Sequence, residues 1–162
     1  MTTGMRNSMQ ERHQRRAGDR LEPQVAAAIA QAQQQGNTLS LIVLDVDEFR
    51  QINEMYGHDV GDQVLAKLST IVEQQAGLPI VRWGGEEFAI LCPEHNLKEA
   101  EALAERIRSA VANHGFSKTG AITISLGVAI HQTGKPATDV VQRAIAATYQ
   151  AKTAGKNRVI VG

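Results

Sequence analysis

Residues 82–88 have the sequence Arg-Trp-Gly-Gly-Glu-Glu-Phe and separate two short apolar runs, residues 78–81 and 88–91. Glycine adopts the positive φ angles of tight hairpin turns at little cost, so a glycine pair between two apolar runs predicts a β-hairpin. Glu86 and Glu87 would then stand beside the turn of this hairpin. By themselves these acids fit either a solvated turn or a functional site.

A second acidic pair, Asp45 and Asp47, ends the apolar run of residues 39–47. A run of this length predicts a buried central strand, and side chains two residues apart on a strand point to the same side. Neither acidic pair has a cysteine or histidine cluster near it in the sequence. Carboxylates in such a setting favour the oxygen-seeking ions Mg²⁺ or Mn²⁺ over zinc, and these ions commonly accompany the phosphates of a nucleotide.

Outside these two stretches the hydrophobic pattern predicts alternating helices and strands. The expected helices cover about 22–35, 49–55, 60–72, 97–111 and 137–154, with a turn between Gly57 and Gly61. The expected further strands are 121–130, which alternates strictly and should have one apolar face, and 158–161. Because a hairpin interrupts the alternation, we predict an α+β or α/β sandwich in which helices flank a mixed central β-sheet.

The length of 162 residues fits one domain, which we place at residues 21–162 behind a polar N-terminal arm or helix of residues 1–20. The 17 Lys and Arg residues balance the 17 Asp and Glu residues, so no overall field recruits nucleic acid or an anionic membrane. The single cysteine, Cys92, excludes an internal disulfide, and its apolar surroundings predict a buried, inert thiol. No apolar run could span a membrane or act as a signal peptide, so we expect a cytoplasmic protein.

The sequence contains neither a Gly-x-x-x-x-Gly-Lys-[Ser/Thr] loop nor a Gly-x-Gly-x-x-Gly motif, which excludes the commonest nucleotide-binding folds. A phosphate would instead meet backbone N–H groups in residues 48–50 and cations from elsewhere in the chain. Lys152 and Lys156 are four residues apart near the end of the last predicted helix and should share a face. Stabilisation of the helix dipole is the alternative role for these two lysines.

Asn53 and Asp62 flank the glycines of the predicted 57–61 turn. A carboxylate that accepts from N1–H and the 2-amino group, with an amide beside it, would select guanine over adenine. Helix capping is the alternative, because Asp62 stands at the start of a predicted helix. The residue pattern alone leaves both interpretations open.

Four blocks of the chain resemble, in order, the signature blocks of GGDEF domains, the diguanylate cyclases. They are Asp45-Val46-Asp47-x-Phe49-x-x-Ile52-Asn53-x-x-Tyr56-Gly57-His58-x-x-Gly61-Asp62, then residues 82–88, then Thr123-Ile124-Ser125-Leu126-Gly127-Val128, and then Tyr149-x-Ala151-Lys152-x-x-Gly155-x-Asn157. The similarity covers about residues 39–161. Residues 3–7 are loosely similar to the family's N-terminal element.

The resemblance implies a palm-like fold related to nucleotide cyclases and polymerases. It also implies condensation of two GTP into cyclic di-GMP and pyrophosphate, by attack of a 3′-hydroxyl on an α-phosphate across a homodimer. A sensory or receiver domain is expected to precede such a domain in the full-length protein. The alternative is a catalytically weak GGDEF module that binds GTP or cyclic di-GMP and signals through a partner.

Carried over position by position, the resemblance assigns a role to each block. Asp45 and the backbone carbonyl of Val46 would bind Mg²⁺, together with Glu86 and Glu87. One of these two glutamates, most often Glu86, would help to deprotonate the attacking hydroxyl. Asn53 and Asp62 would contact guanine, and Phe49 and Arg50 would belong to the phosphate-binding loop. Lys152 and Lys156 would contact the terminal phosphates.

The sequence departs from the family pattern at three places. The Arg-x-x-Asp product-inhibition site is replaced by Gln75 and Leu78, so we expect no feedback inhibition there. Lys156 replaces an arginine, which keeps the charge and loses the bidentate fork, so triphosphate binding should be weaker. Ile145 replaces an aspartate, and this change predicts altered local packing.

Overall fold

The computed structural model describes residues 20–162, so the predicted N-terminal arm, apart from Arg20, and residues 3–7 lie outside the described residues. A helix over residues 20–34 comes first. The elements that follow are β1 (Leu39–Val46), α2 (Phe49–Tyr56), α3 (His58–Ala76), β2 (Ile80–Arg82), β3 (Glu87–Pro93), α4 (Leu97–Asn113), β4 (Ile124–Ile130), α5 (Ala137–Thr153) and β5 (Val159–Val161). The predicted hairpin is confirmed as β2 and β3.

The five strands form one sheet in the order β2-β3-β1-β4-β5. Strand β1 lies at the centre and pairs antiparallel with both β3 and β4. Strand β2 is antiparallel to β3, whereas β5 runs parallel to β4. The mixed sheet predicted from the interrupted alternation is therefore confirmed.

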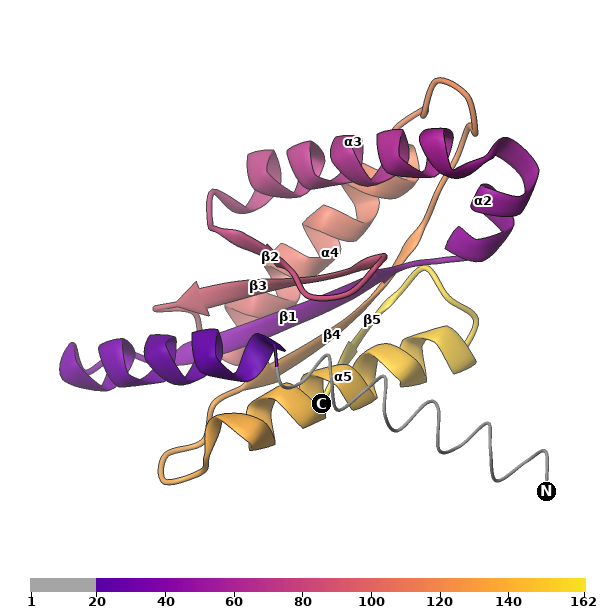
Figure 1. Ribbon diagram of the computed structural model, residues 1–162. Helices are drawn as coiled ribbons and strands as arrows, with labels where there is room; N and C mark the ends of the chain where they lie inside the picture. The colour runs from indigo at the N-terminus through magenta and orange to yellow at the C-terminus, as the bar shows by residue number, and fades with distance from the viewer. Residues whose placement is uncertain (1–19) are drawn as a thin grey trace.

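Helices cover both faces of this sheet (Figure 1). On one face α3 and α4 bury apolar residues such as Leu68 and Leu103 against Ile42 and Leu44 of β1. On the other face the helix of residues 20–34 and α5 pack against residues that include Val43. Successive side chains of a strand point to opposite faces, so β1 feeds both cores along its length. The predicted sandwich follows directly from this division.

Strand β4 corrects one expectation. It begins at Ile124 instead of residue 121, and both of its faces are buried. The alternation in the sequence distinguishes large side chains from small ones, because Ser125, Gly127 and Ala129 face the helix layer of α5. A Cβ atom on Gly127 would collide with the backbone of Ala144 in α5. The small residues therefore allow α5 to pack closely on β4, and they do not mark a solvated face.

The start of α3 is a second correction. The helix begins at His58, after Gly57 with φ 88°, and it contains Gly61 and Asp62 in its first two turns. The predicted turn between Gly57 and Gly61 is therefore wrong, and Asp62 does not cap the helix. A single glycine with a positive φ is enough to separate α2 from α3, which makes a longer turn unnecessary.

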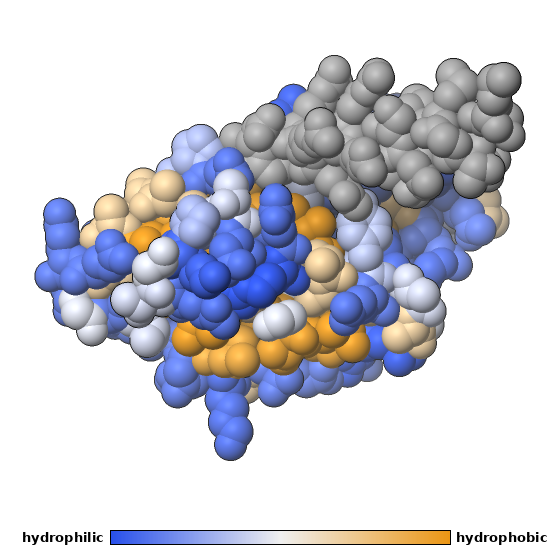
Figure 2. All heavy atoms as spheres, turned by 90° about the horizontal axis from the view of Figure 1, so that it is seen from below, coloured by the Kyte–Doolittle hydropathy of each residue, from blue (hydrophilic) through white to orange (hydrophobic). Residues whose placement is uncertain are grey.

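The described surface is that of an ordinary globular domain. Seen from below, the face is mostly polar, with apolar side chains gathered in a narrower band (Figure 2). Within residues 20–162, none of the helices combines the length and apolar character needed to cross a bilayer.

Cys92 is fully buried, and burial raises the pKa of its thiol to about 12, which confirms the inert thiol expected from the sequence.

Candidate active site

Two carboxylates face each other at the end of β1 and the start of β3. Asp45 is directly opposite Glu87 in the antiparallel register, so both side chains leave the sheet on the same face, toward α5. Before Glu87 the chain makes a tight turn, in which the N–H groups of Trp83 and Gly84 donate to the Glu87 carbonyl at 3.1 and 3.4 Å. Like charges in such a cross-strand pair are destabilising unless a cation lies between them.

The electrostatics of Asp45 reflect this crowding. Burial raises the pKa of Asp45 to about 7, and repulsion from Glu86 and Glu87 adds to the rise, whereas Lys152 opposes it. Glu86 is half-buried in the turn before β3, and its carbonyl accepts from the Val46 N–H at 3.2 Å. The hairpin therefore brings both glutamates close to the end of β1, as the sequence predicted.

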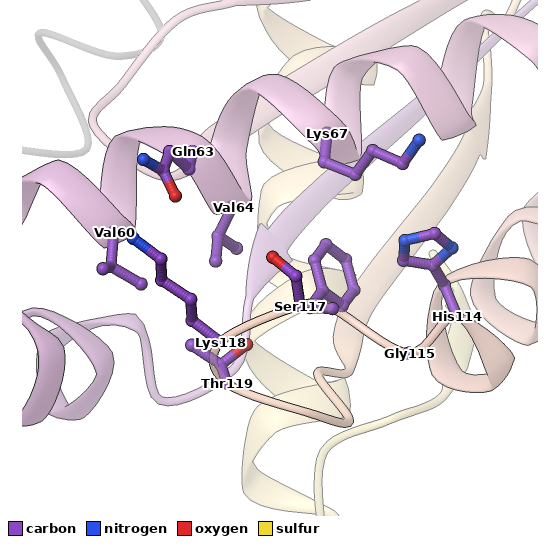
Figure 3. A pocket seen from close by; sticks show the side chains of 10 residues that line it. Val60, Gln63, Val64, Lys67, His114, Gly115, Ser117, Lys118 and Thr119 are labelled. Carbon is purple, nitrogen blue, oxygen red and sulfur yellow. The ribbon is translucent and has the colours of Figure 1, made fainter.

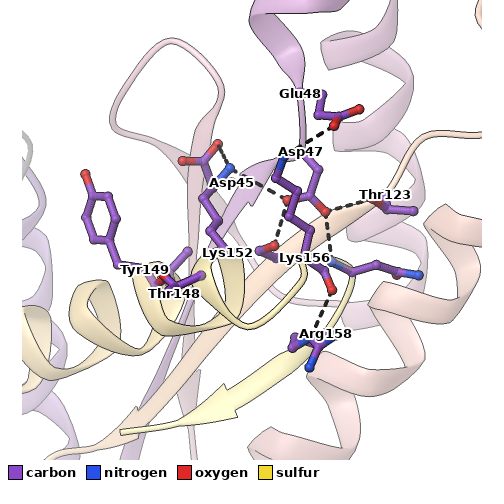
Figure 4. Close-up of polar contacts among 12 residues, drawn as sticks. Asp45, Asp47, Glu48, Thr123, Thr148, Tyr149, Lys152, Lys156 and Arg158 are labelled. Atoms are coloured by element: carbon purple, nitrogen blue, oxygen red, sulfur yellow. Dashed lines mark hydrogen bonds and ion pairs between the residues drawn. The ribbon is translucent and has the colours of Figure 1, made fainter.

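Lys152 supplies the positive charge nearest to these acids. Its Nζ atom lies 3.3 Å from Oδ1 of Asp45 and 3.7 Å from Oδ1 of Asp47, as the dashed lines in Figure 4 show. The Asp45 Oδ1 atom is buried, and this ion pair does not have the geometry of a hydrogen bond. The Oδ1 atom of Asp45 is therefore only partly satisfied.

The predicted shared face of Lys152 and Lys156 is wrong. Helix α5 ends at Thr153, and Gly155, with φ 126°, turns the chain before Lys156, which itself has φ 65°. Lys156 consequently lies outside the helix, and its Nζ atom contacts Oε1 of Glu48 at 3.3 Å. The two lysines thus reach the loop after β1 from different elements, Lys152 from α5 and Lys156 from the turn that follows this helix.

Asp47 has a different environment from Asp45. Its carboxylate accepts from Thr123 Oγ1 at 2.7 Å, from Ser125 Oγ at 2.6 Å and from the Asn157 backbone N–H at 3.0 Å. Only 5% of Asp47 is exposed. These bonds tie the loop after β1 to β4 and to the segment after α5. Thr123 and Ser125 were not recognised as site residues from the sequence, because their pairing with Asp47 depends on the β1–β4 register.

The residues predicted to bind guanine come from α2 and α3. Asn53 lies in α2, and its Oδ1 atom is buried without a hydrogen-bond partner among residues 20–162. A Cβ atom on Gly61 would collide with this oxygen, and it would lie 3.2 Å from the Phe49 ring. Gly61 therefore makes room for the Asn53 side chain. The neighbouring Asp62 is exposed on α3.

Arg50 directs its side chain to solvent. Its guanidinium pairs with Glu54 at 3.1 Å on the outer surface of α2, where 92% of the arginine side chain is exposed. Phe49, by contrast, is half-buried and packs against the core. Residues 48–50 open α2, and the first N–H groups of a helix have no partner within the helix, as the predicted phosphate contact requires.

A cavity of about 420 Å³ adjoins the loop after β1. It lies between α2 and the turn after α5, and Glu48, Ile52, Thr123 and Lys156 are among the residues that line it. Its polar lining residues, which include Asp47, Thr123 and Lys156, make it part of the same candidate site.

Trp83 is a third residue that the sequence analysis did not assign. Its indole is 3% exposed, and its Nε1 has no acceptor among the described residues. It lines a small cavity together with Asp45, Glu87 and Ile145. Ile145 is buried in the same core cluster as Trp83, so the isoleucine that departs from the family pattern acts in packing.

The oxygen donors of this site fit a divalent cation. Asp45, Glu86 and Glu87 are all carboxylates, the ligand type that Mg²⁺ and Mn²⁺ prefer, and Asp45 carries a buried oxygen without a well-directed donor. In residues 20–162, however, no three acidic, histidine or cysteine side chains converge closely enough to hold an ion as they stand. The ammonium group of Lys152 is the cation that now lies against Asp45.

Comparison with known proteins identifies the class of domain to which this fold belongs. Residues 16–158 match the family model described as diguanylate cyclase, GGDEF domain. Among solved structures, the GGDEF domain of DgcB from Caulobacter crescentus, in complex with c-di-GMP, superposes with a TM-score of 0.81 at 34% identity over 87% of each chain. The active GGEEF domain of a diguanylate cyclase from Vibrio cholerae gives a TM-score of 0.81 at 34% identity, over 87% of this chain and 93% of that one.

This chain therefore belongs to the GGDEF domain family. It is 42% identical over 123 residues to diguanylate cyclase DgcM of Escherichia coli K12, a match that covers 75% of this chain and 30% of that protein. It is 34% identical over 146 residues to response regulator PleD of Caulobacter vibrioides, over 85% of this chain and 32% of that protein. The chain thus spans about a third of the length of these curated relatives.

Proposed function

We propose that this domain condenses two GTP molecules into cyclic di-GMP with release of pyrophosphate. The observation that carries the proposal is the cross-strand pair of Asp45 and Glu87, with Lys152 beside it. Two carboxylates held this close are costly to ionise together, and the arrangement is explained if this end of the sheet is half of a metal and phosphate site.

In this proposal the nucleotide is held at both ends. Asn53 and Asp62 bind the guanine edge, for which the unsatisfied Oδ1 of Asn53 supplies a ready acceptor. The backbone N–H groups of residues 48–50 and the ammonium groups of Lys152 and Lys156 bind the phosphates. Lys152 and Lys156 now pair with Asp45 and Glu48, so each lysine exchanges a carboxylate for a phosphate when the substrate enters.

Asp45, which Lys152 would leave, and the two glutamates of the hairpin are the proposed metal ligands, together with one backbone carbonyl. Asp45, the Val46 carbonyl, Glu86 and Glu87 would hold Mg²⁺ or Mn²⁺. A divalent ion bound there would neutralise phosphate charge and polarise the α-phosphate. Release of Asp45 from Lys152 frees its buried Oδ1 for this contact.

We assign the proton transfer to Glu86. Glu86 lies in the turn and is half-buried, whereas Glu87 is 8% exposed and fixed opposite Asp45. The more accessible carboxylate is better placed to accept a proton from the 3′-hydroxyl of a second nucleotide. Glu87 would then act mainly as a ligand and as an orienting charge.

One domain offers one such half-site, so the reaction requires two domains facing each other as a homodimer. Replacement of the product-inhibition pair fits a domain without feedback at that surface, because Leu78 packs against the core and Gln75 is neutral. We further propose that a sensory or receiver domain precedes this one, and that the protein acts in the cytoplasm, where GTP is available.

The direct test is incubation of the concentrated protein with GTP and Mg²⁺, followed by chromatographic detection of cyclic di-GMP. Glu86→Gln and Glu87→Gln should abolish the product, whereas Glu73→Gln, on the exposed side of α3, should leave the rate unchanged. GTP binding without product at high protein concentration would contradict the proposed reaction. That result would favour the alternative, a GGDEF module that binds nucleotide and signals through a partner.

A further inference from the structure

A separate cavity of about 290 Å³ lies between α3 and the loop of residues 114–119 (Figure 3). We call it the α3 cavity. On α3 it is lined by Val60, Gln63, Val64 and Lys67, whose spacing places them on one face of the helix. Its volume is near the lower end of the range for small-molecule sites, about 300 Å³ and upward.

The α3 cavity is distinct from the proposed guanine contacts. Asp62 is two residues from Val60, a rotation of about 200° around the helix, so it lies on a different side of α3. Thr119 is the one lining residue that the α3 cavity shares with the cavity beside Lys156, and neither Asn53 nor Asp62 lines the α3 cavity. A ligand of the α3 cavity would therefore not compete directly for the proposed guanine position.

The loop that covers the cavity is held in shape by its own backbone. The N–H of Phe116 donates to the Gly120 carbonyl at 3.2 Å, and the N–H of Gly120 donates back at 3.0 Å. The Phe116 ring is 6% exposed and meets the His114 ring edge-on, with 4.7 Å between the centroids. The Phe116 ring and Val64 give the cavity an apolar middle.

The charges of the α3 cavity are all of one sign. Lys67 and Lys118 line it, and no aspartate or glutamate does. In the described part of the chain, neither lysine forms an ion pair or a hydrogen bond, in contrast to Lys152 and Lys156. In Figure 3 the Lys118 side chain extends toward Val60, whereas Lys67 extends over the side of His114, so their ammonium groups lie at opposite ends.

Hydroxyl groups add hydrogen-bonding capacity near these cations. Ser117 lines the cavity, and the Thr119 Oγ1 atom is buried without a partner among residues 20–162. Buried hydroxyls are normally satisfied, so an unsatisfied one in a cavity wall is available to bind a polar group. Cations at the two ends, an apolar middle and free hydroxyls together specify the chemistry of a ligand.

We propose that the α3 cavity binds a small organic anion that has an apolar body and a negatively charged group at each end. The apolar body would lie against Val64 and Phe116, and the two anionic groups would meet Lys67 and Lys118. Charge-assisted hydrogen bonds to two separate lysines would give such a molecule an advantage over one with a single charge.

The test uses three matched probes on the full chain labelled with ¹⁵N. Terephthalate carries two carboxylates on one ring, benzoate carries one, and 1,4-benzenedimethanol carries none. Terephthalate at millimolar concentration should shift the amide resonances of Gln63, Lys67 and Ser117, benzoate should bind more weakly, and the neutral diol should bind least. Lys67→Gln and Lys118→Gln should each weaken terephthalate binding by about fivefold. Lys98→Gln, an exposed lysine on α4, should not change it.

Four results would overturn the proposal, two of which concern the strength of binding. One is the absence of any shift at these amides with terephthalate. The two that concern strength are equal binding of terephthalate and the neutral diol, and binding that neither lysine substitution weakens. The last is a set of shifts confined to the surroundings of Lys152 and Lys156, which would place the dianion in the proposed triphosphate region. None of these results depends on cyclic di-GMP synthesis, so the proposal is tested independently of the enzymatic activity.

Discussion

Asp45 and Glu87 lie directly opposite each other in the β1–β3 pair, and both carboxylates point toward α5. Among the described acidic residues, Asp45 also has the pKa that is raised furthest above its ordinary value, to about 7. Asp47, two residues away, accepts three hydrogen bonds and belongs to the scaffold. Neighbouring acids of one motif thus have opposite roles, one destabilised in the resting state and the other stabilised.

Asp45→Asn should stabilise the metal-free protein at pH 8. The folded state holds the Asp45 proton up to about pH 7, whereas an ordinary aspartate loses it near 3.8. The stability that Asp45 contributes is therefore present below pH 3.8 and is lost as the pH rises through 7. Chemical denaturation between pH 4 and pH 8 should show this loss in the wild type and not in the variant. Added Mg²⁺ should stabilise only the wild type, and a variant that is less stable than the wild type at pH 8 would contradict the assignment.

Asp47→Asn should destabilise the protein by about 2 kcal/mol, because the amide cannot reproduce all three accepted hydrogen bonds. Glu48→Gln is the matched control, since the Glu48–Lys156 pair is about half exposed and such pairs contribute about 0 to 1 kcal/mol. Urea denaturation at pH 7 measures both. Equal stability of the two variants would show that Asp47 is not part of the scaffold.

Gly61→Ala should weaken GTP binding about tenfold while it changes stability by about 1 kcal/mol or less. The added methyl group collides with the end of the Asn53 side chain, which can rotate away only by leaving its present position. Gly115→Ala is the control, because a Cβ atom there meets nothing within 4 Å. Calorimetry with a non-cyclisable GTP analogue gives the affinities, and unchanged binding by Gly61→Ala would remove Asn53 from the nucleotide site.

Lys156→Arg should strengthen binding of the triphosphate by about threefold to tenfold, because a guanidinium can engage phosphate oxygens in a bidentate manner. The lysine lines the cavity between α2 and the turn after α5 and lies outside the helix, so the longer fork needs no rearrangement of α5. Lys98→Arg, on the exposed surface of α4, should have no effect. Calorimetry with the same non-cyclisable GTP analogue measures the affinity. An affinity equal to that of the wild type would place the triphosphate away from Lys156.

Cys92 should not react with thiol reagents at pH 8 while the protein is folded. Burial raises the pKa of this thiol to about 12, so the reactive thiolate is scarce, and the fully buried sulfur is also inaccessible. Colour development with a disulfide reagent should begin only when denaturant unfolds the chain. Rapid reaction of the native protein would indicate that β3 opens frequently.

Local patterns in the sequence predicted most of the elements. The apolar run before Asp45 and the glycine pair before Glu86 specify a buried strand and a hairpin through nearest-neighbour chemistry alone. The same reasoning placed Gly61 in a turn, whereas it lies inside α3, and it started β4 three residues too early. Gly61 leaves room for the Asn53 side chain of α2, and Gly127 leaves room for the backbone of α5; local patterns carry no information about these contacts.

The sequence by itself determined the acids, the amide and the lysines of the candidate site, because each is a residue type that its chemistry requires. Only the tertiary structure decided how they divide their roles. The β1–β3 register sets Asp45 against Glu87, and the β1–β4 register ties Asp47 to Ser125. The end of α5 sends Lys152 and Lys156 to different partners. These relationships join residues about 40 to 110 positions apart, and only the packing of strands and helices fixes distances across such separations.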